Sequence, residues 1–547
     1  MRFQTSHKHQ PFFALLAAAS SGALLALSSL FPQLFVLAWV AFVPLLLALR
    51  HTHSLGQAYR LGLCTGIVLY VLSTYWMVDF IQLLNNYSLA LSVSLAAVYW
   101  LYCAQMIALI TVLTQYCRRG NSGLWVFAII VSGVFAFYPT LFSVQVGETQ
   151  SEFLIALQGI EFTGVHGLDF IVALVNGLIA QAILSKNYFA KRSVGIAYTL
   201  VFLWFGYGAW SLPYWHSVQK NASPLKVGMV QANQPPSTKP SAPHPGFSRT
   251  YPLEMAMAEQ LIEHQVDLLV WPEMRTRDYY DREFVREAYR KRVNAWQTPL
   301  IFQDREFQRD ADGSQQFNTA TLLNENGELA GQYRKMQLIP VAEYLPWVGG
   351  FSSQTNKELK RWLRREFGSF FTDFTAGSKP EYFDTNEAVI IPLICYEVMF
   401  PSFVAKSVAN ASTNQNQKGQ LLLAQSNNSW FGDTRQPYQH LAASVLRSVE
   451  NRLPFVHAVN NGPGAVVLPS GEKLFQSAYR ETSAYVVDVP LIARPTSENA
   501  SWLASIFKNE SGNTFYSRHP NLFLIFITVA FGFVLIRTWF AKPNESI

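Results

Sequence analysis

Charged side chains are scarce in this sequence. Only 14% of its 547 residues are Asp, Glu, Lys or Arg, whereas soluble domains carry about 25%. Residues 11–49 contain no charged residue, and Asp79 is the only one between residues 61 and 117. Such runs exclude an ordinary soluble enzyme, a disordered chain and a nucleic-acid-binding protein. The formal net charge of +6 comes from basic residues in short loops between apolar runs, where it reports on membrane topology rather than on an acidic partner.

The charge-free runs are long enough to cross a lipid bilayer, which takes about 20 apolar residues in a helix. The first run is not a cleavable signal peptide, because it lacks a small-residue cleavage site and a second apolar run follows at once. The sequence therefore predicts a multi-pass α-helical membrane domain of about eight transmembrane helices. Seven of them precede residue 215, centred near residues 20, 42, 70, 100, 130, 172 and 203, and the eighth lies at about 521–540.

The basic residues of the loops predict how these helices are oriented. Every second loop carries Lys or Arg, and the loops between them carry almost none. By the positive-inside rule, the N- and C-termini are cytoplasmic and the polar segment after Trp215 lies on the outer side. The basic residues that support this orientation are Arg2, Lys8, Arg50, Arg60, Arg118, Arg119, Lys186, Lys191, Arg192, Arg537 and Lys542.

The segment from about residue 224 to residue 496 has ordinary globular composition and is long enough to bury a sizeable core. Short Val/Ile/Leu-rich runs, which are typical of buried strands, alternate with stretches of helical spacing at residues 252–264 and 436–452. This order predicts a layered α/β domain. The expected strands lie at residues 225–233, 266–273, 388–397, 419–427 and 454–461. The chain therefore divides into a membrane domain (1–215), an outer domain (216–500) and a linker with the last span (501–547).

Cysteine is also rare, and its positions are informative. Cys64, Cys103 and Cys117 lie in or beside membrane spans, where a thiol behaves as a small buried hydrophobic group. Cys395 is the only cysteine of the outer domain, so it has no partner there for a disulfide. It ends a predicted buried strand, and side chains at strand ends line the crevice in which α/β folds place their chemistry.

Two further residues complete a catalytic constellation with Cys395. Glu273 ends the predicted strand in LLVWPE, and Lys335 lies in the loop YRKMQLIPVAEYLP. A nucleophilic cysteine reacts as its thiolate, and a neighbouring carboxylate can accept the proton as general base. A lysine ammonium can stabilise the oxyanion that forms when a carbonyl is attacked. We therefore take Glu273, Lys335 and Cys395 as candidate catalytic residues.

In this order and with these flanking residues, the three resemble the Glu–Lys–Cys triad of the nitrilase superfamily of carbon–nitrogen hydrolases. Together with the predicted spans, the chain resembles the apolipoprotein N-acyltransferase family. The resemblance implies an α/β nitrilase-like four-layer αββα sandwich for the outer domain. It rests on WPE (271–273), YRKxxLxPxxEYxP (333–346), CYExxFP (395–401), SNxxWFGD (426–433), QHL (439–441), NNG (460–462), GVHGLDFIVALVNG (164–177) and TFYSRHP (514–520).

The resemblance also implies supporting roles for residues around the triad. Glu343 would be a second carboxylate close to it, and Tyr396 and Glu397 would shape the turn that carries the nucleophile. From their apolar composition alone, we also expect the segments at residues 345–347 and 362–374 to contact lipid or gate its entry. The candidates for substrate binding are Trp271, Trp430, Phe431, Asp433 and Asp79.

The implied reaction belongs to lipoprotein biosynthesis. An acyl chain would pass from a membrane phospholipid to Cys395 as a thioester, and then to the α-amino group of the N-terminal S-diacylglyceryl cysteine of an apolipoprotein. The partners would be the phospholipid donor, the apolipoprotein acceptor and membrane lipids, with no nucleic acid, metal or organic cofactor. The resemblance places the enzyme in the bacterial cytoplasmic (inner) membrane with its catalytic domain in the periplasm.

Three other hypotheses remain open at this point. The same triad could serve a membrane-bound amidase that hydrolyses a carbon–nitrogen bond with water as acceptor. It could also serve an N-acyltransferase for a different amine. The third is a transporter or binding scaffold with an inactive nitrilase-like domain, against which the intact triad and the scarcity of ionisable residues in the spans both argue.

Overall fold

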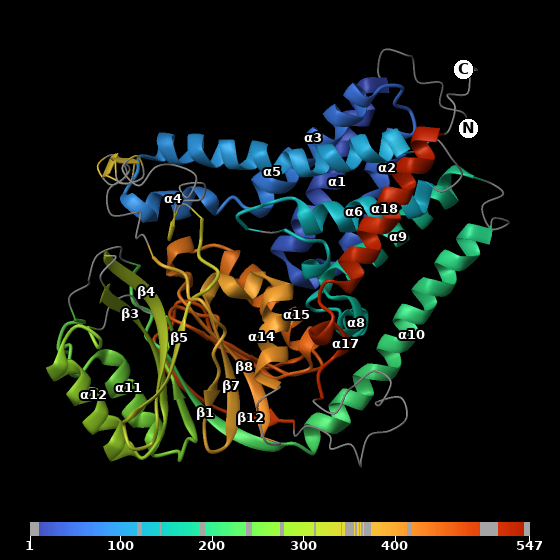
Figure 1. Cartoon of the computed structure of the whole chain (residues 1–547). Helices are drawn as coiled ribbons and strands as arrows, with labels where there is room; N and C mark the ends of the chain where they lie inside the picture. The colour runs from blue at the N-terminus through green and yellow to red at the C-terminus, as the bar shows by residue number, and fades with distance from the viewer. Residues whose placement is uncertain are drawn as a thin grey trace. The chain divides into compact units, whose positions relative to one another are not determined.

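This computed structural model describes residues 10–117, 123–142, 144–185, 192–236, 243–273, 278–310, 313–340, 342–344, 374–412, 418–492 and 512–540, with isolated residues between 355 and 365. Its internal contacts divide the chain into two units (Figure 1). One unit comprises Met1–Val78, Val93–Pro213 and His519–Ile547, and the other comprises Asp79–Ser92 and Tyr214–Arg518. The domain boundaries expected after residues 215 and 500 remain predictions.

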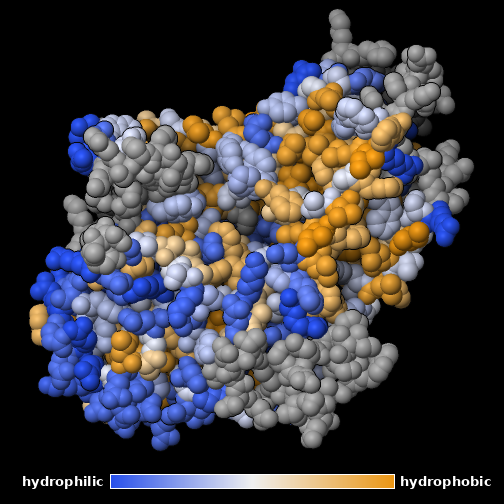
Figure 2. Space-filling view, in the orientation of Figure 1, coloured by the Kyte–Doolittle hydropathy of each residue, from blue (hydrophilic) through white to orange (hydrophobic). Residues whose placement is uncertain are grey.

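Apolar helices lie at each of the eight positions expected for membrane spans. Within the described residues, seven are long and apolar enough to cross a membrane, and the helix near residue 130 is shorter, with 15 residues. Their surfaces are apolar: Phe526, Val529 and Phe533 on the last helix are 62–67% exposed, and hydrophobic side chains gather over this helix in Figure 2. Such a surface belongs in lipid rather than in water. The helices are α1 (Gln10–Leu30), η1 (Pro32–Trp39) with α2 (Val43–Leu49), α3 (Leu55–Ser73), α5 (Leu89–Cys117), α6 (Gly123–Phe137), α9 (Val165–Leu184), α10 (Arg192–Lys220) and α18 (Leu522–Phe540).

The second expected span is interrupted between η1 and α2. An interruption exposes backbone polar groups, and each unpaired group costs several kcal/mol in a bilayer (about 2–7). Asn176 of α9 pairs two of them: its Oδ1 accepts from the N–H of Phe42 at 2.8 Å, and its Nδ2 donates to the carbonyl of Ala38 at 2.9 Å. This contact explains the asparagine in the sequence VNG at residues 175–177.

The second unit contains two six-stranded mixed sheets. In the first sheet the strand order is β12-β1-β2-β3-β4-β5, and in the second it is β11-β10-β9-β8-β7-β6. Parallel pairs occupy the centre of each sheet, namely β1–β2–β3 and β7–β8–β9. The strands are β1 (Ser223–Gln231), β2 (Leu268–Val270), β3 (Leu300–Asp310), β4 (Gly313–Leu323), β5 (Leu329–Arg334), β6 (Phe383–Asp384), β7 (Ala388–Ile394), β8 (Gly419–Ser426), β9 (Phe455–Val459), β10 (Ala465–Val467), β11 (Lys473–Gln476) and β12 (Ser483–Leu491).

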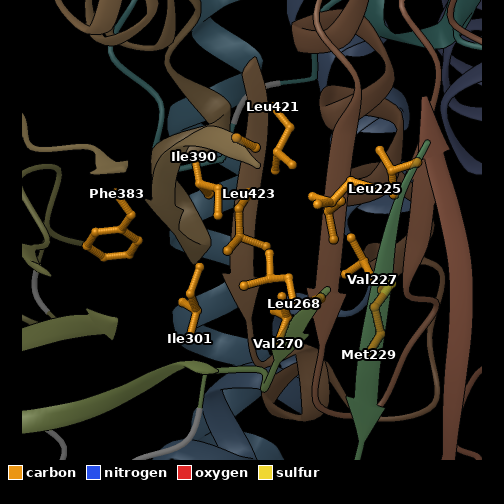
Figure 3. Close-up of a cluster of buried hydrophobic side chains, with 14 of the residues drawn as sticks. Leu225, Val227, Met229, Leu268, Val270, Ile301, Phe383, Ile390, Leu421 and Leu423 are labelled. Atoms are coloured by element: carbon orange, nitrogen blue, oxygen red, sulfur yellow. The ribbon is translucent and has the colours of Figure 1, made fainter. Parts of the chain in front are cut away.

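The two sheets pack face to face over a shared apolar core. Leu268 and Val270 from the first sheet meet Leu421 and Leu423 from the second in this core (Figure 3). Because side chains alternate along a strand, Leu269 points the other way, into a second core against the helices. Helices α11 (Leu253–Ile262) and α12 (Glu283–Trp296) cover the first sheet, and α14 (Pro401–Ser412) and α15 (Gln436–Asn451) pack on the second. The expected αββα sandwich is therefore confirmed.

Candidate active site

The three candidate catalytic residues all follow the carboxyl ends of strands. Glu273 comes three residues after β2, Lys335 directly after β5, and Cys395 directly after β7. Strand β5 runs in the same direction as β2, since two antiparallel pairings separate it from the parallel pair β2–β3. The carboxyl ends of β2 and β5 therefore lie at one edge of the first sheet. The thiol of Cys395 lies within hydrogen-bonding reach of the Glu273 carboxyl group, and the ionised forms of the three residues interact with one another.

Asn318 on β4 forms hydrogen bonds with both Glu273 and Lys335. Its Nδ2 donates to Glu273 Oε1 at 2.9 Å, and its backbone carbonyl accepts from the N–H of Lys335 at 2.8 Å. One residue of a paired strand thus fixes both the carboxylate and the backbone that carries the lysine. No motif in the sequence pointed to this role of Asn318.

Lys335 is buried and paired with the carboxylate of Glu343. Its Nζ lies 2.9 Å from Glu343 Oε1, and Glu343 Oε2 accepts from the N–H of Ile339 at 2.8 Å. The loop is closed by two further bonds, from Phe374 N–H to the carbonyl of Glu343 and from Gly377 N–H to the carbonyl of Lys335. Glu343 therefore orients the ammonium group and anchors it to its own loop.

Burial and charge set the protonation states in this cluster. Burial raises the pKa of Glu273, against the opposing charge of Lys335. Burial also raises the pKa of the Cys395 thiol, the Glu273 carboxylate raises it further, and Lys335 opposes both. Burial disfavours the Lys335 ammonium, but Glu343 and Glu273 outweigh it and hold the pKa of Lys335 above its usual value. The resting site thus holds a neutral thiol, a lysine cation and, at Glu273, a carboxyl group of raised basicity.

Glu397 joins the turn that carries Cys395 to the loop that carries Lys335. Burial raises the pKa of the Glu397 carboxyl group, and the four hydrogen bonds that its oxygens accept oppose that rise. Oε2 accepts from the N–H of Ile394 at 2.7 Å, and Oε1 accepts from the Tyr333 hydroxyl and the Met336 N–H at 2.7 Å each and from the Gln337 N–H at 3.1 Å. These bonds place Cys395 relative to the β5 loop.

The backbone of Cys395 is in the left-handed region, with φ of 51°. A non-glycine residue rarely adopts this conformation, and it costs about 1–2 kcal/mol. The sharp turn lies between β7 and the 3-10 helix η6 (Cys395–Met399), and the thiol receives a hydrogen bond from the backbone N–H of Asn427 at the end of β8. Two adjacent parallel strands therefore contribute to the sulfur's position.

His440 is part of this site, although the sequence assigned it no role beyond membership of the QHL motif. It is buried on α15, and its Nε2 lies 3.2 Å from the backbone carbonyl oxygen of Cys395. Its Nδ1 lies 3.1 Å from Asn428 Oδ1. Burial lowers the pKa of His440 to about 4, so the imidazole is neutral at physiological pH. No group of three or more His, Cys, Asp or Glu residues that could hold a metal ion occurs among the described residues.

One of the predicted substrate-binding residues requires a correction. Trp271 is fully buried in the core between the first sheet and its helices, where its ring packs edge-on against Tyr289. It has the same parity along the chain as Leu269, which points into the same core. Its side chain is therefore not available to a substrate, and its contribution to the site is the backbone carbonyl that accepts from Gln425 Nε2.

Two residues of the predicted substrate-binding loop lie in η7 (Asn428–Phe431), directly after Asn427. Trp430 is half-buried there, and Phe431 is buried and stacks on Phe80 with ring centroids 5.0 Å apart. Phe80 belongs to α4 (Met77–Asn85), a short helix whose residues from Asp79 onward group with the α/β unit. The loop beside the nucleophile is thus packed against a segment that precedes it by about 350 residues.

The remaining predicted residues are placed as follows. Asp433 is exposed and pairs with Arg480 at 3.1 Å. Asp79 lies beside Gly432, since a Cβ placed on Gly432 would lie 3.5 Å from the Cβ of Asp79. Tyr396 is buried against Phe400 and does not face solvent. The segment at 345–347 and most of 362–374, expected to contact lipid, lie outside the described residues.

Two family models match this chain, and several known proteins are similar to it. The family model of the apolipoprotein N-acyltransferase N-terminal domain matches residues 21–178, and that of carbon-nitrogen hydrolase matches residues 226–503. An apolipoprotein N-acyltransferase from Geobacter metallireducens is 30% identical over 489 residues, which cover 85% of this chain and 88% of that protein. One from Chlorobaculum tepidum is 26% identical over 556 residues, with coverages of 94% and 93%. A solved amidase from Nesterenkonia sp. is similar at 20% identity and a TM-score of 0.34, over 49% of this chain and 92% of its own.

The two helix-covered mixed sheets and the matching family model define the second unit as a carbon-nitrogen hydrolase domain. Apolar helices precede this domain, and another follows it, so the protein is a membrane protein. The chain belongs to the apolipoprotein N-acyltransferase family. The family and fold class predicted from the sequence are thereby confirmed.

Proposed function

We propose that this chain transfers an acyl chain from a membrane phospholipid to the α-amino group of the N-terminal S-diacylglyceryl cysteine of apolipoproteins. The observation that carries the proposal is the convergence of Glu273, Lys335 and Cys395 at strand ends in a chain of this family. A thioester at Cys395 preserves the energy of the ester bond, so the transfer needs no separate energy source.

The first half-reaction acylates Cys395. Its sulfur attacks the ester carbonyl as its proton passes to Glu273, whose pKa burial has raised. The carbonyl oxygen becomes an oxyanion, which the Lys335 ammonium stabilises. When the ester C–O bond breaks, Glu273 returns the proton to the departing oxygen of the lysophospholipid. A thioester remains on Cys395, and Glu273 is again a carboxylate.

The second half-reaction uses the same groups. The acceptor's amine attacks the thioester carbonyl, and Glu273 accepts the proton that the amine releases. Lys335 again stabilises the oxyanion until the C–S bond breaks. The Cys395 thiolate leaves and recovers the proton from Glu273, so that the amide product departs from a regenerated site.

The location in the cell follows from the arrangement of charge. The basic loops, such as those with Arg50 and Arg60, lie in the cytoplasm, together with both termini. The α/β domain (216–500) then lies in the periplasm of a bacterial cytoplasmic membrane, between the helical domain (1–215) and the final segment (501–547). The donor is a lipid of the membrane, and the diacylglyceryl group of the acceptor anchors it in the same membrane. An enzyme held in this membrane therefore meets both by diffusion in two dimensions.

Mass spectrometry of the full-length protein in detergent tests the proposal. After incubation with phosphatidylethanolamine, we expect an acyl-sized mass increase that Cys395→Ser abolishes and the matched control Cys103→Ser, in α5, retains. A diacylglyceryl-cysteine peptide should remove the adduct and become N-acylated. Removal by water but not by the peptide would contradict acyl transfer and favour the amidase hypothesis. No adduct on a thiol that still reacts with iodoacetamide would refute the phospholipid as donor.

A further inference from the structure

The carbonyl of the nucleophile has a dedicated hydrogen-bond donor outside the triad. Cys395 lies in the left-handed conformation, and in a strained turn the direction of each peptide group decides where the side chain points. The carbonyl of Cys395 faces His440 Nε2 at 3.2 Å. The imidazole contacts the backbone of the nucleophile, and the hydrogen-bond acceptor for the thiol is Glu273. This arrangement separates the groups that move protons from a group that holds the turn.

The surroundings of His440 define its tautomer. A bond to a carbonyl requires a proton on Nε2, so a neutral ring must accept at Nδ1. Asn428 faces Nδ1 with the oxygen of its amide at 3.1 Å, and as oriented its Nδ2 has no partner among the described residues. Turning this amide by 180° lets Nδ2 donate to Nδ1 and gives the orphaned donor its partner.

A closed chain of contacts follows from this assignment. Asn428 adjoins Asn427, whose backbone N–H is bonded to the Cys395 sulfur. Asn427 is held in turn by Asn460, whose Nδ2 donates to Asn427 Oδ1 at 3.1 Å. Starting at the sulfur, the chain runs through the N–H of Asn427, the side chain of Asn428 and the ring of His440, and it returns to the carbonyl of the same cysteine. The imidazole thus fastens the end of β7 to the end of β8.

We propose that His440 is a positioning residue for the nucleophile: its neutral ring donates to the carbonyl of Cys395 and accepts from Asn428, and so keeps the thiol between Glu273 and the N–H of Asn427. The inference rests on the proposed function, because it takes Cys395 as the nucleophile. It assigns no proton transfer to His440. The polar contacts that carry it are those of Cys395 and Asn428.

Substitutions at His440 separate positioning from base catalysis. In His440→Gln, the amide nitrogen can occupy the place of Nε2 and donate to the same carbonyl, whereas His440→Leu has no donor. We expect His440→Leu to slow acylation of Cys395 by about 10- to 30-fold, as expected for one lost hydrogen bond, with little change in KM for phospholipid. His440→Gln should recover most of this loss. The matched control is His457→Leu, which removes a buried imidazole 5.0 Å away whose Nδ1 pairs with Ser444.

Alkylation by iodoacetamide provides a second measurement that needs no lipid. In His440→Leu the sulfur loses its alignment with the Asn427 N–H. The alkylation midpoint, which is the pH of half-maximal alkylation rate, should therefore move to higher pH. In His440→Gln this midpoint should return to the wild-type value. If His440→Leu does not fold, Asn428→Ala removes the other contact and should produce a smaller shift of the same sign. A wild-type acylation rate per alkylatable thiol in His440→Leu, or an unshifted midpoint, would overturn the proposal. Equal inactivity of His440→Gln and His440→Leu would also overturn it, because a base role would then be indicated.

The two proposals fail in distinguishable ways. If the wild-type protein forms no thioester from phospholipid, the proposed function fails, and the alkylation profiles still decide the role of His440. If the thioester forms in His440→Leu as fast as in the wild type, the proposed function stands and the positioning role is refuted.

Discussion

Replacing Glu397 with glutamine changes one oxygen of the site to an amide nitrogen at constant size. If the remaining oxygen keeps its three donors, the new NH2 group faces the N–H of Ile394, where a 2.7 Å bond existed. Loss of that charge-assisted bond costs about 1.5–3 kcal/mol, and weakening of the other three adds about 0.5 kcal/mol each. The total of about 3–4.5 kcal/mol predicts a melting temperature lower by about 6–18 °C, at about 2–4 °C per kcal/mol. Thioester formation should fall more than tenfold, because the turn with Cys395 is no longer tied to the loop with Lys335.

Thermal unfolding in detergent and thioester formation by mass spectrometry measure the two effects. Glu387→Gln is the matched control, since Glu387 is exposed just before the same strand. Tyr333→Phe removes only one of the four donors and should give an intermediate effect of about 1 kcal/mol. If Glu397→Gln melts and reacts like Glu387→Gln, the four-bond connection does not position the nucleophile and the reasoning is refuted.

Three further predictions concern charge and packing. Burial raises the pKa of Glu273 above its ordinary value of 4.5, and Glu273 must be ionised to act as the base. The initial rate of thioester formation should therefore fall with decreasing pH through a midpoint above 4.5. A midpoint at or below 4.5 would contradict this prediction. Glu343→Gln removes a charge that raises the pKa of Glu273 and frees Lys335, so this midpoint should move to lower pH; a shift to higher pH would contradict it. Phe80→Ala removes the stack on Phe431, an aromatic pair worth about 0.5–1.5 kcal/mol beyond its buried area. Thioester formation should become several-fold slower in Phe80→Ala but not in Phe80→Tyr, which keeps the ring. Equal rates in both variants would argue against a role for this contact.

The central strands could be predicted from the sequence because they are buried on both faces. Strands β7, β8 and β9 are continuous apolar runs, as expected when helices cover one face and a second sheet covers the other. The long β3–β4 hairpin was not predicted. Its sequence, LIFQDREFQRD followed by GSQQFNTATLL, is rich in charged and amide side chains, and its strand character comes from an 11-pair ladder that only the folded chain provides.

The site was predictable to the extent that it depends on strand ends and on family motifs. Glu273, Lys335 and Cys395 each follow a strand, so their proximity follows from the topology of the sheets. His440 could not be assigned in the same way, because it lies 45 residues beyond Cys395 in a helix and its contact is with a backbone oxygen. Trp271 was misassigned although its parity with Leu269 already directs it into the core.

The arrangement of charges explains why a second carboxylate accompanies the triad. Had Lys335 only Glu273 as partner, the ion pair would lower the pKa of Glu273 and make it a poor base. In this site Glu343 holds the ammonium at 2.9 Å, and its negative charge raises the pKa of Glu273. When the proton of Cys395 moves to Glu273, the sum of charges in the buried cluster stays the same, so no additional charge has to be desolvated. The cation is then free of competition from Glu273 at the moment when the oxyanion forms beside it.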